Sequence, residues 1–342
     1  VRQLLRKRNI IRTTNTNAST IVDCTSSIEL RMNTVSSIYM PHSIDLSVII
    51  PVYNVEKYLP HCLESVLIQA DNNIEVIAIN DGSIDKSPEI LDRYATQYPS
   101  LKIINQPNQG VSAARQKGIT VAHGKYILFL DADDFLEASS LSILYKKAIE
   151  ADADMVLMDY YTYNPDDQKK TYIQQTSIHQ YSQASLLKQM FCAERAWAVW
   201  SYIAKKELHE TIKYNLVSDL SIGEDAVYTT QIVLAAHKIT SINRPLINYV
   251  SRPDSVTQQK NISDRQFSSY LKFPQRIYDL LYPSYLYPEL KESIAYVFLR
   301  ACYETFYFHH FKNAATIARL AYRQQQVIKS EKLLNNFGKR HY

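Results

Sequence analysis

The chain has 342 residues, of which 46% are hydrophobic and 21% are charged, and its formal net charge is +4. This length and hydrophobic content suffice for one large domain or two modest ones with a hydrophobic core. So mild a positive charge does not indicate a nucleic-acid-binding protein, and we expect no nucleic-acid partner. Because no run of about 18 apolar residues occurs, the sequence predicts no membrane-spanning helix.

The cysteines and the first residues indicate a cellular compartment. The four cysteines form no CxxC pair and have no metal-ligand spacing: Cys24, Cys62, Cys192 and Cys302. Scattered cysteines are typical of reduced thiols in a cytosolic protein. Val1–Arg8 is basic but lacks the apolar segment of a signal peptide. We therefore expect a cytoplasmic protein, either free or at the inner face of the cytoplasmic membrane.

Composition and periodicity divide the chain into three predicted regions. Residues 1–44 are rich in Thr, Ser and Asn without sustained periodicity, which predicts an irregular or disordered leader. Residues 45–257 alternate strand and helix patterns, strongly over 45–160 and more weakly over 161–257. In residues 258–342, apolar and tyrosine positions recur at helical spacing, which predicts a helical C-terminal extension.

Taken in order, the elements of the strongly patterned region alternate. Short apolar runs predict strands at 46–51, 74–79, 101–104, 126–130 and 155–160. Helical spacing predicts helices at 59–69, 87–98, 111–122 and 136–151. Ser87 followed by Pro88 is expected to cap the second helix. This alternation predicts an α/β fold, in which a mainly parallel sheet carries helices on both faces.

The weaker second half predicts fewer regular elements. A polar loop or extended excursion is expected at 165–180, a helix at 182–192 and a buried aromatic segment at 196–203. A helix is expected from Gly223 to about His237, followed by an extended segment at 239–249 and a polar loop at 252–257. The chain reads as helical from Ser263 onward.

An apolar run, Tyr126–Leu130, ends in three carboxylates: Asp131, Asp133 and Asp134. Carboxylates crowded at a strand end repel one another, so a cation is their natural partner. In an open α/β sheet, ligands bind outside the carboxyl ends of the strands. A solvated helix cap would explain one aspartate better than three in four positions. The cluster therefore predicts a divalent-metal site.

Four motifs occur in order along the chain: Ser47–Asn54 (SVIIPVYN), Asn80–Ser83 (NDGS), Asn108–Gly118 (NQGVSAARQKG) and Asp131–Asp134 (DADD). Together they resemble the motifs of family 2 glycosyltransferases, inverting enzymes of GT-A fold that use nucleotide sugars. The resemblance is dense over residues 46–159 and looser over 197–257. The second half and the tyrosine-rich tail resemble bacterial transferases that decorate lipopolysaccharide or other surface glycans. The resemblance implies a Rossmann-like GT-A fold and a nucleoside-diphosphate sugar, with a UDP-sugar expected.

Two of these motifs suit a nucleobase. The ring of Tyr53 offers a stacking surface, and Asp81 can accept a hydrogen bond from the imide N–H of a base. The resemblance implies that Pro51, Tyr53 and Asp81 bind the nucleotide. An ordinary turn is the alternative explanation for Asn80–Ser83.

Two arginines are further candidates for donor binding. Arg115 stands in the first turns of a predicted helix, where a cation favours an anion or a polar ligand edge. A structural salt bridge is the alternative for Arg115, and the neighbouring Gln116 replaces the Asn usual in the family. The resemblance places Arg252 near the diphosphate, and a solvated loop arginine is its alternative.

The resemblance also assigns roles to the carboxylates. It implies that Asp131 contacts the ribose and shares a Mn²⁺ or Mg²⁺ ion with Asp133, while the role of Asp134 stays open. One or two carboxylates bridging such an ion to a diphosphate is a usual arrangement. In the pair Glu224–Asp225, the resemblance implies that Asp225 is the general base, with Glu224 as its neighbour or substitute. Complementing a helix dipole is the alternative for this pair.

The expected function is therefore metal-assisted, inverting transfer of a sugar to a hydroxyl of a cell-surface glycan or lipid-linked saccharide. A sugar-nucleotide nucleotidyltransferase is one alternative, although the first strand is not followed by the Gly-rich basic loop that holds a triphosphate. A catalytically idle binding module is the other. The chain end carries a group of basic residues, which either contacts anionic lipid at a membrane surface or is a solvated helical face: Arg319, Arg323, Lys329, Lys332, Lys339 and Arg340.

Overall fold

The computed structural model describes residues 44–176, 180–212, 219–252 and 263–307. These residues belong to one unit, His42–Tyr342. The predicted leader up to residue 43, most of the predicted loop at 252–257 and the basic chain end lie outside the described residues. The predicted domain boundaries stay predictions.

The first half of the chain forms βαβ units, as the periodicity predicted. Its strands are β1 (Leu46–Val52), β2 (Ile74–Asp81), β3 (Leu101–Gln106) and β4 (Tyr126–Phe129). Its helices are α2 (Leu59–Leu67), α3 (Ser87–Gln97) and α4 (Val111–Val121). The four strands pair in parallel, and every residue of β1 and β2 is buried. Continuous apolar runs form such strands because helices cover both of their faces.

The second half extends the same sheet. Its strands are β5 (Phe135–Leu136), β6 (Met155–Asn164), β7 (Lys169–Ile173), β8 (Gln180–Tyr181), β9 (Tyr202–Lys205) and β10 (Ile239–Val250). Its helices are α5 (Ser140–Glu150), α6 (Gln183–Phe191), the short 3₁₀ helix η1 (Val199–Ser201), α7 (Lys206–Thr211) and α8 (Glu224–Ala235). The strand order is β3-β2-β1-β4-β9-β6-β10-β5.

The sheet is mainly parallel, as predicted, but one central strand is reversed. Between β3 and β10, the described strands run in one direction except β9, which is antiparallel to both β4 and β6. The sequence indicated only a buried aromatic segment at 196–203, because a four-residue strand carries too little pattern to reveal its direction. The amino end of β9 therefore lies level with the carboxyl end of β4, where Ile203 pairs with Leu128.

Residues 169–173 form β7, a hairpin partner of β6, within the loop or extended excursion predicted at 165–180. Two local predictions were wrong. Helix α5 begins at Ser140 and not at 136, because Phe135–Leu136 pairs with β10 as β5. Lys86, not Ser87, is the N-cap of α3, since the Ser87 hydroxyl accepts a hydrogen bond from the Val55 N–H instead.

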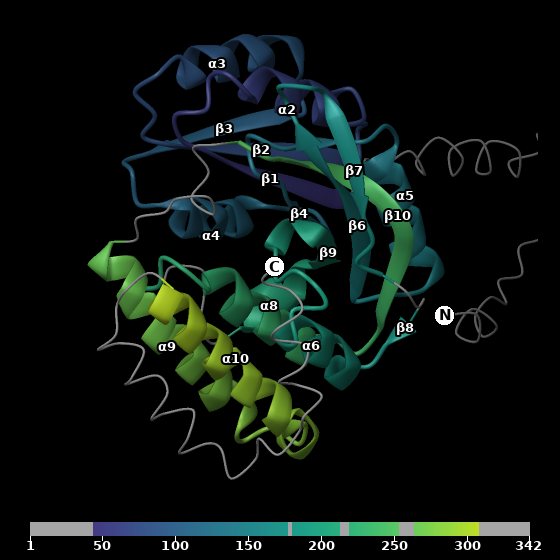
Figure 1. Ribbon diagram of the computed structural model, residues 1–342. Coiled ribbons are helices and arrows are strands. Elements are labelled where there is room, and N and C mark those ends of the chain that lie inside the picture. The colour runs from purple at the N-terminus through teal and green to yellow at the C-terminus, as the bar shows by residue number, and fades with distance from the viewer. Residues whose placement is uncertain (1–43, 177–179, 213–218, 253–262, 308–342) are drawn as a thin grey trace, which may run out of the picture. The chain divides into compact units, whose positions relative to one another are not determined.

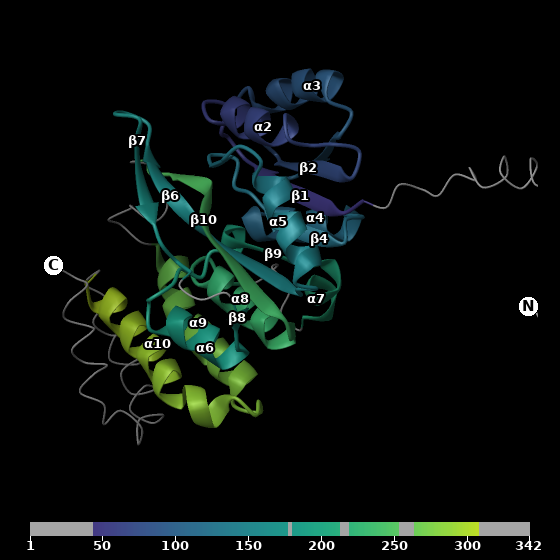
Figure 2. The ribbon, with the colours of Figure 1, turned by 90° about the vertical axis from the view of Figure 1, so that its right-hand side faces the viewer.

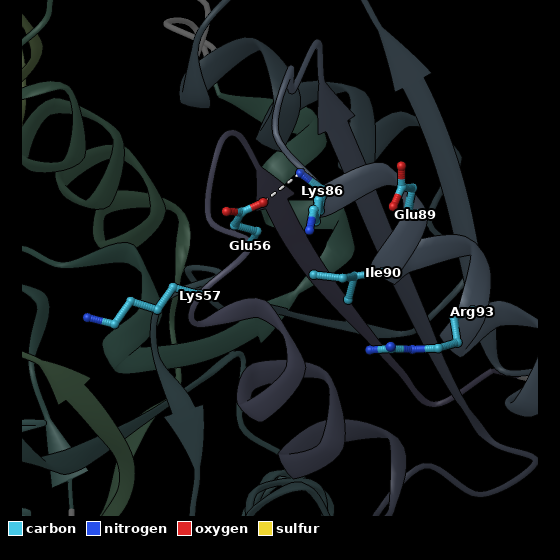
Figure 3. Close-up of a pocket in the computed structure, with 6 residues that line it drawn as sticks. All are labelled: Glu56, Lys57, Lys86, Glu89, Ile90 and Arg93. Carbon is cyan, nitrogen blue, oxygen red and sulfur yellow. Dashed lines mark hydrogen bonds between the residues drawn. The ribbon is translucent and has the colours of Figure 1, made fainter.

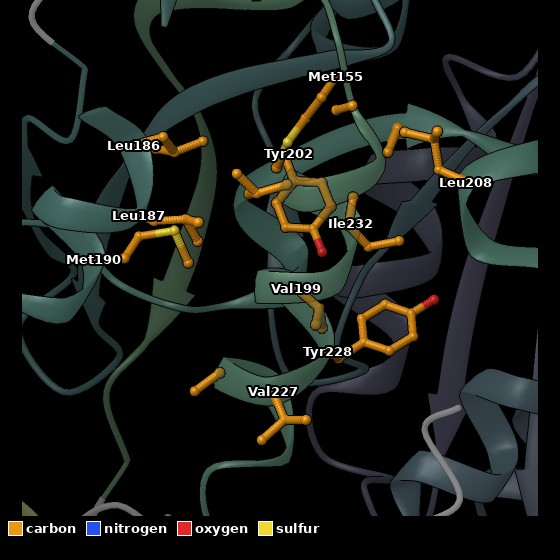
Figure 4. Close-up of a cluster of buried hydrophobic side chains, with 14 of the residues drawn as sticks. Met155, Leu186, Leu187, Met190, Val199, Tyr202, Leu208, Val227, Tyr228 and Ile232 are labelled. Atoms are coloured by element: carbon orange, nitrogen blue, oxygen red, sulfur yellow. The ribbon is translucent and has the colours of Figure 1, made fainter. Parts of the chain in front are cut away.

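Helices cover both faces of the sheet (Figures 1 and 2). Apolar residues of α2, α3 and α5 pack on one face, and those of α4, α6 and α8 pack on the other. Figure 4 shows the second cluster, to which α6 contributes Leu187 and Met190 and α8 contributes Val227 and Ile232. Burial of these side chains is the main stabilising contribution to such a layered fold.

The helical C-terminal region is confirmed through residue 307. It consists of α9 (Asp264–Leu281) and α10 (Tyr287–Tyr307), which lie side by side against α6 and α8 (Figure 1). A capping box formed by Ser263 and Gln266 begins α9. Of the helices in the described ranges, none is long and apolar enough to cross a membrane.

Candidate active site

The predicted site residues gather at the carboxyl edge of β1, β2 and β4. Parallel strands present their following loops at one edge, so Tyr53, Asp81 and Asp131 approach it from three adjacent strands. Pro51 is tolerated in a central strand because β4 pairs with β1 only as far as Ile49. Its missing N–H therefore leaves no ladder bond unmade at the end of β1.

The loop after β1 is bonded along its length to the loop after β2. Asn54 N–H donates to Ser83 Oγ at 3.2 Å, and Ile84 N–H donates to Asn54 Oδ1 at 2.9 Å. Asn54 has a φ of 51°, a left-handed conformation that asparagine tolerates better than most residues. The neighbouring Tyr53 ring is 48% exposed on this fixed backbone. The ring is thus available for stacking.

A charged hollow of about 490 Å³ lies outside this pair of loops (Figure 3). Figure 3 shows the Lys86 N–H bonded to the Glu56 carboxylate, at 2.8 Å, across the two loops. The hollow is lined by Glu56, Lys57, Lys86, Glu89, Ile90 and Arg93. None of the predicted site residues lines it, so we build the candidate site from the carboxyl edge itself.

Asp81, at the end of β2, is buried and already bonded within the protein. Its Oδ1 accepts from Gln106 Nε2 at 2.8 Å and from the Gln109 N–H at 2.9 Å, while its Oδ2 accepts from the Gly110 N–H at 2.8 Å. Next to it, Gly82 has a φ of 73°, and a Cβ there would lie 2.8 Å from the Asn108 nitrogen. Asp81 therefore anchors the loop that leads into α4.

Arg115, on α4, joins the two predicted carboxylate groups. Its Nη2 lies 2.6 Å from Asp131 Oδ1 and its Nη1 lies 3.1 Å from Asp225 Oδ1. The side chain is only 4% exposed, and its Cζ lies 5.9 Å from the centre of the Phe129 ring. The structure thus brings together one residue after β4, one on α4 and one on α8.

The first turn of α8 packs against α9, and this packing fixes the position of Asp225. Gly223 has a φ of 79°, and a Cβ at this position would collide with the Phe273 ring of α9. Only glycine allows the chain to turn into α8 so close to that ring. The Val199 N–H, just before β9, also donates to the Asp225 carboxylate.

Asp133 has a different arginine partner. Its Oδ2 lies 2.7 Å from Arg252 Nε, and the Arg252 Cζ lies 5.5 Å from the centre of the Tyr58 ring. Asp133 is 19% exposed and Arg252 is 21% exposed. The predicted donor-binding arginine therefore does lie beside the predicted metal-binding carboxylate.

Asp134 is turned into the protein. Its Oδ1 accepts from the Val250 N–H at 2.8 Å, at the end of β10, while its buried Oδ2 has no hydrogen-bond partner among the described residues. Cys62 donates its thiol proton to the Asp131 carbonyl oxygen at 3.7 Å. The Cys62 contact ties the aspartate loop to α2, and the Val250 contact ties it to β10. Asp134 is thus bonded to the backbone at the end of β10, whereas Asp133 contacts the Arg252 side chain.

The electrostatics of this edge oppose ionisation. Burial and then the neighbouring Asp131 charge raise the pKa of Asp133, and burial raises the pKa of Asp134 well above its ordinary value. Burial and then the Asp225 charge raise the pKa of Glu224 to about 7. Burial also raises the pKa of Asp225, although Arg115 acts in the opposite direction.

Asp131 and Asp133 fit the requirements of a magnesium or manganese ion. Both carboxylates keep exposed surface, at 28% and 19%, and like charges raise the pKa of Asp133, which a cation would relieve. Within the described ranges, no group of three or more His, Cys, Asp or Glu side chains has a metal-binding arrangement. An ion here would take its other ligands from a diphosphate and water.

Sequence reasoning did not find two features of this site. The Arg115–Asp225 contact joins positions 110 residues apart, and no local pattern reveals such a pair. The Val199 N–H reaches Asp225 because β9 is reversed, and the sequence pattern does not reveal the direction of β9. Trp200, in contrast, agrees with the buried aromatic segment predicted at 196–203, since it is 7% exposed and its ring stacks on that of Tyr249 with 5.6 Å between the ring centres.

Comparisons with known proteins agree with the predicted fold class and family. A family model described as glycosyl transferase family 2 matches residues 47–211. The chain is 32% identical over 221 residues to the glycosyltransferase GlyA of Streptococcus pneumoniae, a match that covers 62% of this chain but 31% of GlyA. It is 30% identical over 279 residues to the uncharacterized glycosyltransferase YibD of Escherichia coli, covering 75% of this chain and 78% of YibD.

A solved structure shares the fold. Residues 1–349 of TarS from S. aureus, in complex with UDP-GlcNAc, superpose with a TM-score of 0.57 at 17% sequence identity. The superposition covers 82% of this chain and 92% of that chain. At this identity the likeness concerns the fold alone, and it confirms the predicted α/β class.

Proposed function

Because this chain belongs to glycosyltransferase family 2, we propose that it transfers a sugar from a nucleoside-diphosphate donor to a hydroxyl group of its acceptor. One observation carries the proposal most directly: the two Nη atoms of Arg115 contact the donor-side Asp131 and the predicted base Asp225. We further propose that the donor is a UDP-sugar. The UDP-GlcNAc in the TarS structure supports this donor class.

In the proposed reaction, Asp225 accepts the proton of the acceptor hydroxyl. The hydroxyl oxygen forms a bond to the anomeric carbon while the bond from that carbon to the diphosphate breaks, with inversion. Asp131 and Asp133 would hold a Mg²⁺ or Mn²⁺ ion, which supplies positive charge to the departing diphosphate. Arg252, beside Asp133, adds further positive charge at the same place.

The geometry of the loops supports the proposed nucleotide-binding roles. The exposed Tyr53 ring is proposed to stack on the base, beside Pro51 at the end of β1. Asp81 is proposed to receive the imide N–H of the base at a lone pair that its three internal donors leave unused. Asp131 is proposed to contact the ribose.

The acceptor is proposed to be a cell-surface glycan or a lipid-linked saccharide. This proposal is supported by the resemblance of the second half to transferases that decorate surface glycans. It extends to peripheral contact with a membrane through the basic chain end, which lies outside the described residues. Glu224 is proposed to assist Asp225 as the neighbouring acid of the pair.

A binding panel followed by a transfer assay tests the function. Thermal-shift screening against nucleotide sugars, with and without Mn²⁺, should show stabilisation by at least one donor that increases with the metal. Turnover of that donor should then be lost in both Asp133→Asn and Asp225→Asn. Donor binding without turnover under all conditions would favour an idle binding module, and release of pyrophosphate from a nucleoside triphosphate would favour a nucleotidyltransferase.

A further inference from the structure

Arg115 occupies an unusual position between the two halves of the proposed site. Its guanidinium is 4% exposed, whereas its partners Asp131 and Asp225 are 28% and 30% exposed. The arginine therefore lies behind the two carboxylates, which keep their open sides toward the site. A residue buried in this way acts on ligands mainly through the groups that it holds.

Packing alone does not account for this arrangement. Burying a guanidinium is unfavourable unless its charge and its N–H groups are matched, and Arg115 Nε has no partner among the described residues. The two Nη atoms reach carboxylates that come from different elements, one after β4 and one on α8. A planar fork can hold two such carboxylates at a fixed separation, and a lysine ammonium holds them less rigidly.

The surroundings of Asp225 explain why its carboxylate needs this contact. The charges and ionisable groups facing it are Arg115, Asp131, Glu224, Tyr202 and Tyr228. Two of these are carboxylates, and Arg115 supplies the opposing positive charge. The Arg115 Nη1–H and the Val199 N–H occupy part of the hydrogen-bonding capacity of Asp225. The remaining lone pairs are available to an acceptor hydroxyl.

We propose that Arg115 is a positioning residue for the catalytic base: it orients Asp225 and fixes its separation from the donor-side Asp131. This inference rests on the proposed function, because it takes Asp225 as the base. Arg115 also keeps Asp225 in the form that can accept a proton. Its effect on transfer is exerted through Asp225, and its effect on donor affinity is exerted through Asp131.

The primary test replaces Arg115 by Lys, which keeps the charge but does not bridge two carboxylates as a fork. We expect kcat for transfer to fall about 30-fold, which is less than the roughly hundredfold or larger loss expected when a general base is removed. We expect the Kd of UDP with Mn²⁺, measured by calorimetry, to change less than about threefold, since one charge-assisted contact is retained. The acid limb of the pH profile of kcat should move to higher pH, because Asp225 loses part of its stabilisation as an anion.

Arg252→Lys is the matched control, since Arg252 contacts Asp133 and lies next to the proposed diphosphate. It should weaken donor binding and leave the acid limb in place. Arg115→Gln serves as a second variant if the lysine variant does not fold, as judged by circular dichroism. The neutral amide should move the acid limb further than lysine does.

A double mutant separates this inference from the proposed function. If Arg115 acts through the base, Arg115→Lys should cost less than about threefold in kcat once Asp225→Asn is present. An equal cost in both backgrounds, with an unmoved acid limb, would refute the positioning role while leaving the proposed function intact. Full transfer activity in Asp225→Asn alone would refute the proposed function and this inference together.

Discussion

Glu75, at the amino edge of the parallel sheet, differs from four carboxylates at the carboxyl edge in how its charge is stabilised. At the amino edge, Glu75 at the start of β2 is 3% exposed and accepts from Ser47 Oγ at 2.7 Å and from Lys102 Nζ at 2.6 Å. The His123 N–H donates to it as well. Burial alone would raise its pKa, but these donors lower the pKa to about 2.

At the carboxyl edge the balance is reversed. Asp133, Asp134, Glu224 and Asp225 all have raised pKa values, with burial as the largest cause of each. Among the described residues, fewer donors reach each of these four carboxylates than reach Glu75, and like charges lie nearby. The difference indicates that the amino edge contributes to stability, while the carboxyl edge retains unfavourable charges that a substrate or cation can relieve.

The largest effect is expected from Asp225→Asn. The transfer rate should fall about a thousandfold, because the asparagine amide cannot accept the proton of the acceptor hydroxyl. The free energy of unfolding should fall by less than about 1 kcal/mol, since the amide oxygen can still accept from Arg115. Initial rates and urea denaturation measure the two quantities. A large loss of stability would contradict the contrast between the two edges.

Asp133→Asn should reduce turnover about a hundredfold by weakening the interaction with the proposed cation and diphosphate. Because burial and then the charge of Asp131 raise the pKa of Asp133, removing its charge should leave the unfolding midpoint unchanged or higher. Metal titration of the rate and thermal unfolding without metal are the measurements. An unfolding midpoint lowered by several degrees would show that the Arg252 contact outweighs the crowding.

At the other edge, Glu75→Gln should lower the free energy of unfolding by about 2 kcal/mol at pH 7 while leaving kcat unchanged. The folded-state pKa of Glu75, about 2, lies below its ordinary value of 4.5. Its stabilising contribution is therefore complete above the ordinary value and is lost as pH falls toward 2. Denaturation curves across this range should show a smaller acid-induced loss of stability in the variant than in the native chain.

The smallest expected effect is on the pH dependence of the native enzyme. The raised pKa values of Glu224, about 7, and of Asp225 predict that kcat falls on the acid side beginning near neutral pH. The fall should approach tenfold per pH unit once the base is protonated. Glu224→Gln should move this limb to lower pH, because the carboxylate that opposes ionisation of Asp225 is removed. If the acid limb of the pH profile does not move in Glu224→Gln, Glu224 does not influence the ionisation of the proposed base Asp225.

Much of the fold was predictable because its signals are local. The apolar runs of β1, β2 and β4 and the helical spacing of α2 and α4 identify βαβ units without tertiary information. The direction of β9 and the hairpin partner β7 depend on pairing between distant segments, which single-sequence patterns do not encode.

The same distinction applies to the site. Tyr53, Asp81 and Asp131 could be placed at one edge because each follows a predicted parallel strand. The pairing of Arg115 with Asp225 and of Arg252 with Asp133 could not be predicted, because α8 and β10 reach the edge through tertiary packing. The internal bonding of Asp81 likewise became visible only with the loop before α4 in place.

The reversal of β9 has a consequence for how this protein can diversify. A reversed strand presents its preceding segment at the carboxyl edge, so η1 reaches the proposed base without replacing any nucleotide-binding loop. Substitutions ahead of Tyr202 are therefore expected to alter the surroundings of the proposed base while the loops after β1, β2 and β4 stay unchanged. Libraries that vary residues 193–198, and keep Val199 at its contact, offer a direct route to new acceptor specificity.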